Sequence, residues 1–156
     1  MEDFKNLLRE ANMLFKAVDH MLYVTYPLLK ENKLIINMTE NLNSSLIKAM
    51  EALLYYDRAY KRVEVFPDDF YSKLDVFKRE CAIRYGIDRT YITLIQDLRD
   101  IINERKKSKM EFVRNDKYVI CSDNYSIKTI TISKLKEYLN ISRLFIRKVN
   151  QVIGNV

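Results

Sequence analysis

The sequence predicts a mainly α-helical protein, a bundle of four to five helices with a small β-ribbon inserted before the last helix. The 156 residues include only two glycines and two prolines, fewer turn-forming residues than an all-β sandwich requires. Apolar residues recur three and four positions apart through most of the chain, which is the spacing of one helix face. After Lys109 the spacing changes to the alternation that is typical of strands.

The first helix is predicted to run from the N-terminal residues to about residue 26. Pro27 disfavours helical geometry at Tyr26, so we expect a break or kink there, with one longer, kinked helix as the alternative. The apolar face of this helix consists of Phe4, Leu8, Ala11, Phe15, Val18 and Leu22.

A second helix is predicted over residues 33–62, where apolar residues keep the helical spacing. The Asn and Ser side chains of residues 41–45 compete for backbone hydrogen bonds, so an interruption there is the alternative. We expect the helix to continue through this stretch.

Two further helices are predicted before the basic segment. Residues 67–69, Pro-Asp-Asp, supply a stop and an N-cap for a helix over residues 70–85, and Gly86 is its expected C-cap. Asp88 is expected to cap the fourth helix, whose apolar positions lie between residues 91 and 102.

The ribbon is predicted from the alternating residues 112–120, with Asn115-Asp116 as a two-residue hairpin turn. Residues 125–131 are a candidate third strand. Ser133 is expected to cap the last helix, residues 133–153. No repeat or linker divides the chain, so we predict a single domain over residues 1–156, with a four-helix scaffold (1–104), a basic β-ribbon (105–132) and a C-terminal helix.

Charge is distributed unevenly along the chain. Residues 1–104 contain 15 Lys and Arg against 17 Asp and Glu, whereas residues 105–156 contain 12 against 4. The net charge of +6 therefore arises entirely from the last third. A basic surface attached to a nearly neutral scaffold favours a polyanionic partner.

The sequence lacks the residues that several kinds of reactive site require. His20 is the only histidine, which excludes sites that need two, and two glycines cannot build a phosphate-binding glycine-rich loop. Cys81 lies on an apolar helix stripe and is predicted to be core, and Cys121 is predicted to be structural. We predict no metal and no cofactor.

The N-terminal residues mix acidic and basic side chains within an amphipathic pattern, so they do not resemble a secretory signal. No apolar run approaches the roughly 18 residues that cross a bilayer. We expect a cytoplasmic protein that does not contact a membrane.

The end of the fourth predicted helix carries Arg99 and Asp100, followed at the sixth position by Glu104. This stretch resembles the Arg-polar-x-x-x-His signature of HEPN domains, and the four-helix pattern is also similar. The resemblance implies a helical bundle that binds nucleotide or RNA and commonly forms a homodimer. The active ribonucleases of that family carry His where this chain has Glu104, so the resemblance implies a non-catalytic or divergent member.

The basic residues and interleaved aromatics suggest how RNA would be held. The candidate binding residues are Arg105, Lys106, Lys107, Lys109, Arg114, Lys117 and Tyr118. Cations neutralise phosphates, and tyrosine rings offer faces on which bases stack. Arg105 and Lys106 have a second explanation, because cations at a helix C-terminus also complement the helix macrodipole.

Three hypotheses for function follow, and we expect a binding module rather than an enzyme. The first is a HEPN-like module that binds RNA or a nucleotide through the basic C-terminal surface. The second is a scaffolding bundle that docks an acidic protein partner or forms a homodimer. The third is a ribonuclease that uses Arg99 and Glu104.

Overall fold

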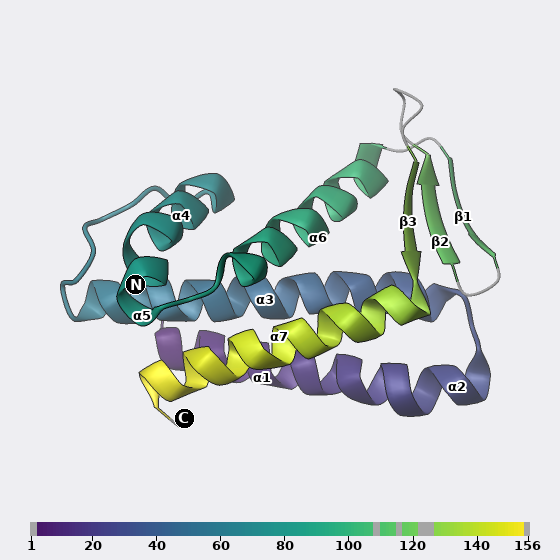
Figure 1. The fold of residues 1–156 in the computed structure, drawn as a ribbon, viewed down its shortest axis with the longest axis horizontal. Coiled ribbons are helices and arrows are strands. Elements are labelled where there is room, and N and C mark those ends of the chain that lie inside the picture. Colours follow the sequence, from purple (N-terminus) through teal and green to yellow (C-terminus); the bar gives the residue numbers. More distant parts are fainter. Residues whose placement is uncertain (1–2, 108–109, 115–116, 122–126, 155–156) are drawn as a thin grey trace.

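The longest helix, α3 (Lys33–Ala59), runs through the centre of the fold, and the other helices pack around it (Figure 1). The computed structural model describes residues 3–107, 110–114, 117–121 and 127–154. The predicted mainly α-helical bundle with a small sheet before the last helix is confirmed. No helix in the described part of the chain is sufficiently long and apolar to cross a membrane.

The N-terminal helical segment continues past the expected break. α1 (Phe4–His20) leads without interruption into a π-helical turn, η1 (Met21–Thr25), and then into α2 (Tyr26–Leu29). The Tyr26 N–H bonds to the Met21 carbonyl, five residues back, and this wider turn directly precedes Pro27. Pro27, which has no N–H to donate, is the second residue of α2 and directly follows this wider turn. The longer helix, rather than the break, is therefore correct.

α3 is not interrupted at residues 41–45, although it ends at Ala59 rather than at residue 62. Ser45 is fully buried, and its hydroxyl donates to the Ala11 carbonyl on α1 over 2.7 Å. Its hydroxyl thus bonds to a neighbouring helix instead of competing for the backbone of α3.

The predicted caps of the next helices are confirmed. α4 (Phe70–Val76), the π-helical turn η2 (Phe77–Cys81) and α5 (Ala82–Tyr85) form one continuous stretch, followed by α6 (Arg89–Lys107). The Asp69 carboxylate accepts from the Ser72 N–H over 2.9 Å, and Gly86 ends α5 with a φ of 62°. Asp88 accepts from the Thr90 N–H over 2.8 Å.

The sheet has three antiparallel strands in the order β1 (Met110–Arg114), β2 (Lys117–Cys121) and β3 (Ile127–Thr131). The candidate third strand is therefore confirmed, whereas the predicted Asn115-Asp116 turn lies outside the described residues. β3 continues directly into the last helix, α7 (Ile132–Ile153). The cap of α7 is Thr131, whose hydroxyl accepts from the Lys134 N–H over 3.0 Å, and not Ser133 as expected, because the helix begins one residue earlier.

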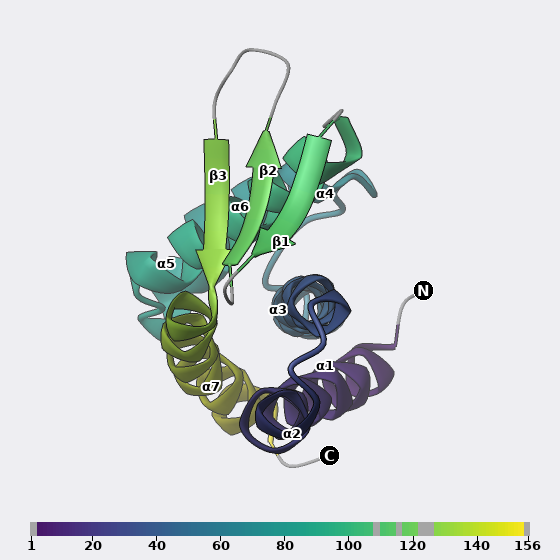
Figure 2. The same cartoon turned by 90° about the vertical axis from the view of Figure 1, so that its right-hand side faces the viewer.

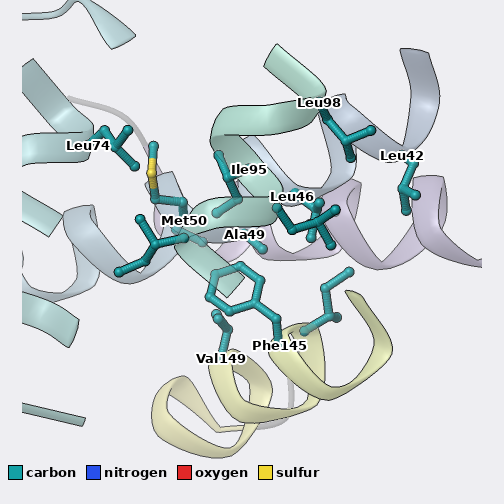
Figure 3. Packing of buried hydrophobic residues seen from close by; sticks show 14 of the residues in the cluster. Leu42, Leu46, Ala49, Met50, Leu74, Ile95, Leu98, Phe145 and Val149 are labelled. Atoms are coloured by element: carbon teal, nitrogen blue, oxygen red, sulfur yellow. The ribbon is translucent and has the colours of Figure 1, made fainter. Parts of the chain in front are cut away.

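The core lies where α3, α6 and α7 meet. Figure 3 shows Phe145 of α7 directed toward Ala49 and Ile95. The Phe145 ring meets the Phe77 ring edge-on, with centroids 6.2 Å apart, and contacts Tyr91. The sheet stands across one end of the bundle and is seen face-on in Figure 2. It adds Tyr118, Ile120 and Ile130 to the core.

Candidate functional site

The basic residues predicted at the end of α6 have different environments. Arg105 donates to the Glu40 carboxylate of α3 over 2.5 Å, so its charge joins α6 to α3. Lys106 and Lys107, one and two residues further on, are exposed. Lys109 lies outside the described residues.

The strands divide the other predicted binding residues by face. Lys117 is exposed at the start of β2, and the next residue, Tyr118, is only 1% exposed. Side chains alternate across a strand, and Tyr118 pairs with Ile130, which is also buried. The expectation that Tyr118 offers a stacking face is wrong, because its ring belongs to the core. The register pairs Arg114 with Lys117, and the side chain of Arg114 lies outside the described set.

Exposed cations from three separate segments lie at the sheet end of the molecule (Figures 1 and 2). We call five of them the sheet-end lysines: Lys106, Lys107, Lys117, Lys134 and Lys136. Within the described residues none of the five forms an ion pair. The sheet between α6 and α7 is about 17 Å long at 3.4 Å per residue, so these lysines border a surface of that length.

Sequence reasoning missed two cations at the same end. Lys30 follows α2 and Lys33 begins α3, both are exposed, and Figure 1 places the turn between these helices at the same end of the molecule as the start of α7. Lys136 of α7 lies 5.5 Å above the ring of Tyr23, which ties α7 to η1. About 100 residues of chain separate these segments, so no local sequence signal could have joined them.

Arg99, the arginine of the HEPN-like motif, lies in a small polar pocket. Its guanidinium stacks 4.9 Å above the Phe70 ring, and the pocket of about 200 Å³ is also lined by Glu51, Asp68 and Lys73. Lys73 is buried and pairs with both carboxylates over 2.7 Å. Burial opposes the charge of Lys73, but the hydrogen bonds that its ammonium donates to Asp68 and Glu51 raise its pKa overall.

Glu104 does not line the pocket that holds Arg99. It follows five residues later on α6, about 140° around the helix at 100° per residue, and is half-buried. Asp100 is exposed. The structure therefore does not bring Arg99 and Glu104 together in one pocket.

A buried carboxylate that sequence reasoning missed lies near the end of α3. Asp57 is fully buried and accepts hydrogen bonds from Arg84 over 2.5 Å and from the Tyr85 hydroxyl. Arg62 lies 3.5 Å from the same carboxylate. Burial and the bond to Asp57 raise the pKa of Tyr85 to about 12. The signal was available, because Asp57 continues the apolar face of Met50 and Leu53 at spacings of three and four.

Cys81 belongs to the same cluster. Its thiol is buried, as predicted, and donates to Asp57 Oδ2 over 3.2 Å. Burial and the neighbouring carboxylate raise the pKa of this thiol. Among the described residues, no group of three or more His, Cys, Asp and Glu side chains forms a candidate metal site.

Comparison with known proteins identifies no relative: no family model, no curated protein and no solved structure matches this chain.

Replacing Asp57 with Ala is expected to lower the free energy of unfolding by about 3 kcal/mol in urea denaturation. This loss of stability lies at the low end of the range for breaking a buried ion pair, because Arg84 and Arg62 still reach solvent. The matched control is Asp75→Ala, which removes an exposed carboxylate paired with Arg79 and should cost less than about 0.5 kcal/mol. Equal losses in the two variants would contradict a structural role for Asp57.

The two thiols are expected to react at different rates with a thiol reagent. Cys121, which is half-buried, should react in the folded protein, whereas Cys81 should react only after unfolding. A raised pKa in the folded state disfavours the thiolate, so raising the pH from about 7 to about 9 should leave Cys81 unreactive. Mass spectrometry of the labelled peptides measures both sites, and fast native labelling of Cys81 is the contrary result.

Proposed function

We propose that this protein is a binding module that holds single-stranded RNA on the basic surface at its sheet end, without turnover. The observation that carries the proposal is the gathering of the five sheet-end lysines, from three segments, with no ion pair to a described residue. Cations without carboxylate partners can neutralise the phosphates of RNA, and this releases the counterions that had condensed around those phosphates.

The surface also offers an aromatic face. Tyr23 is 46% exposed and lies beneath the Lys136 ammonium, beside the start of α7. A base that stacks on this ring would place its phosphates near Lys134 and Lys136. Tyr23 therefore takes the role that we had expected of Tyr118.

Two features support binding rather than cleavage. Arg99 and Glu104 do not share a pocket, and Arg99 instead adjoins the ion pairs of Lys73. His20 is the only histidine of the sequence and lies 3.5 Å from the Thr25 hydroxyl, so no second histidine is available for a pair that acts as general acid and base. The HEPN resemblance, read as a non-catalytic member, implies the same role.

The proposal is tested by fluorescence anisotropy of a single-stranded RNA oligonucleotide between about 50 and 200 mM salt. Affinity should fall steeply with salt, and the RNA should be recovered intact. Changing Lys106, Lys107 and Lys117 together to Ala should make the log–log slope shallower by about 2, at roughly 0.7 per lost phosphate contact.

The matched control changes Lys5, Arg9 and Lys16 to Ala. These side chains are exposed on α1, outside the sheet-end set, and their replacement removes the same charge. The slope of the control should equal that of the unaltered protein. An absence of RNA binding at the lowest salt, or equal slopes in both triple variants, would refute the proposal.

A second candidate function is a scaffolding bundle that forms a homodimer, and one observation favours it. Four adjacent apolar side chains on η1 and α2 are exposed: Tyr23 (46%), Val24 (47%), Leu28 (79%) and Leu29 (57%). Val24 and Leu28 are four residues apart and share one helix face. Contiguous exposed apolar side chains are typical of interaction sites.

A homodimer that buries this face should become monomeric when Leu28 is changed to Asp, as measured by light scattering. Leu144→Asp is the control, because Leu144 is 50% exposed on α7, outside the patch. RNA binding in the Leu28→Asp variant separates the two functions, since the sheet-end lysines are unchanged. A monomer at all concentrations in the unaltered protein would exclude this candidate.

A further inference from the structure

A broad basin lies at the opposite end of the molecule from the sheet. It has a volume of about 1010 Å³ and is formed by the end of α3, the loop that follows α3, and the helical segment at η2 (Figure 1). Four cations and two carboxylates line it: Arg58, Lys61, Arg62, Arg79, Glu64 and Glu80. The lining residues alone therefore carry an excess of two positive charges, although Arg62 and Arg79 also lie beside Asp57 and Asp75, which are outside the lining.

Neither carboxylate of the lining, Glu64 or Glu80, forms an ion pair with Lys61. Glu80 lies 3.7 Å from Arg84, which points to the buried Asp57. Arg79 is paired with Asp75 over 3.0 Å. Lys61 is exposed and makes no ion pair with a described residue.

Lys61 also adopts an unfavourable backbone conformation. Its φ of 58° is left-handed, and it lies directly after the end of α3, a position at which glycine is the favoured residue. Nothing in the local hydrogen bonding requires a lysine side chain, because the bonds from Lys61 and Arg62 to the end of α3 are made by backbone N–H groups. A lysine in this conformation costs stability, and strained residues of this kind cluster at binding sites.

Arg62, the next residue, is held in place by three contacts of its guanidinium group. Its guanidinium lies 3.5 Å from Asp57 and 3.3 Å from the Tyr85 hydroxyl, and 5.1 Å above the ring of Tyr60. These contacts fix the guanidinium at the basin while leaving the side chain 40% exposed. Asp57 is thus a positioning residue for this cation.

The opposite wall of the basin includes η2, which places Arg79 and Glu80. A π-helical turn is rare within a helix and is frequently found at functional sites. Val65, which is 81% exposed, adds an apolar surface at the rim. The lining therefore combines cations with a surface suited to an uncharged group.

We propose that the basin binds the diphosphate group of a small molecule, through Arg58, Lys61, Arg62 and Arg79. Two phosphates carry a negative charge that is complemented by Arg58 and Lys61, neither of which forms an ion pair with a described residue. Lysine and arginine are the usual phosphate ligands. The volume exceeds that of a diphosphate alone, so an organic group attached to it has room beside Val65. This site is separate from the proposed RNA surface at the sheet end.

Titration calorimetry at low salt tests the proposal with inorganic pyrophosphate, ADP and adenosine as probes. Pyrophosphate and ADP should bind, and adenosine should not. Tighter binding of ADP would indicate a diphosphate ester as the ligand, and equal binding would indicate free diphosphate. Binding of adenosine as tight as that of ADP, or no binding of either phosphate compound at millimolar concentration, overturns the proposal.

The decisive variant is Lys61→Gly. It removes one phosphate ligand and relieves the left-handed strain, so affinity for pyrophosphate should fall at least about tenfold while the thermal unfolding temperature rises. A residue with a purely structural role would not give these opposite changes.

The chain provides a matched control in Lys30→Gly. Lys30 is the other non-glycine residue with a positive φ (50°) among the described residues, and it lies at the sheet end. This variant should also gain stability but bind pyrophosphate with unchanged affinity. An equal loss of pyrophosphate affinity in Lys30→Gly, or in the triple variant of Lys106, Lys107 and Lys117, would place the anion at the sheet end. That result would overturn the proposal that the basin binds the diphosphate. RNA binding that fails while pyrophosphate binding persists refutes only the proposed function.

Discussion

The fold depends on bonds between polar side chains of the central helix and the helices that surround it. Other elements cover much of α3, so polar side chains such as Ser45 and Asp57, which are fully buried, need partners within the protein. Four of them each bond to a different element, and each of these bonds fixes that element against α3: Ser45 to α1, Glu40 to α6, Glu51 to α4 and Asp57 to α5. Apolar packing supplies the attraction among the helices, and these four bonds join α3 to its neighbours at four points along its length.

Local sequence signals predicted the parts of the fold that depend on local physics. Helical spacing located the helices, and Asp69, Gly86 and Asp88 cap them as expected. The errors arise where tertiary contacts decide. The π-helical turn at η1 accommodates Pro27, the strand face that meets the helices buries Tyr118, and a buried position retains Asp57 because Arg84 and Tyr85 come from another helix to meet it.

The two candidate sites differ in how far they could be predicted from the sequence. The sheet-end lysines follow from the charge excess of the last third, although Lys30 and Lys33 join them only through folding. The basin combines cations from residues 1–104, where Lys and Arg are slightly outnumbered by Asp and Glu, so a charge count does not predict a basic site there. Lys61 stands out by its positive φ, a property of the folded backbone that cannot be read from composition. Local concentration of charge, rather than net charge, therefore identifies both sites.

The direct junction between β3 and α7 has a structural consequence. Thr131 is both the last residue of the strand and the cap of the helix, so no flexible residue separates them. The direction of β3 therefore fixes where α7 begins, and α7 carries Phe145, which lies against Phe77 at the start of η2. Since η2 also carries Arg79 and Glu80 of the basin, one continuous run of packed elements joins the sheet to the basin wall.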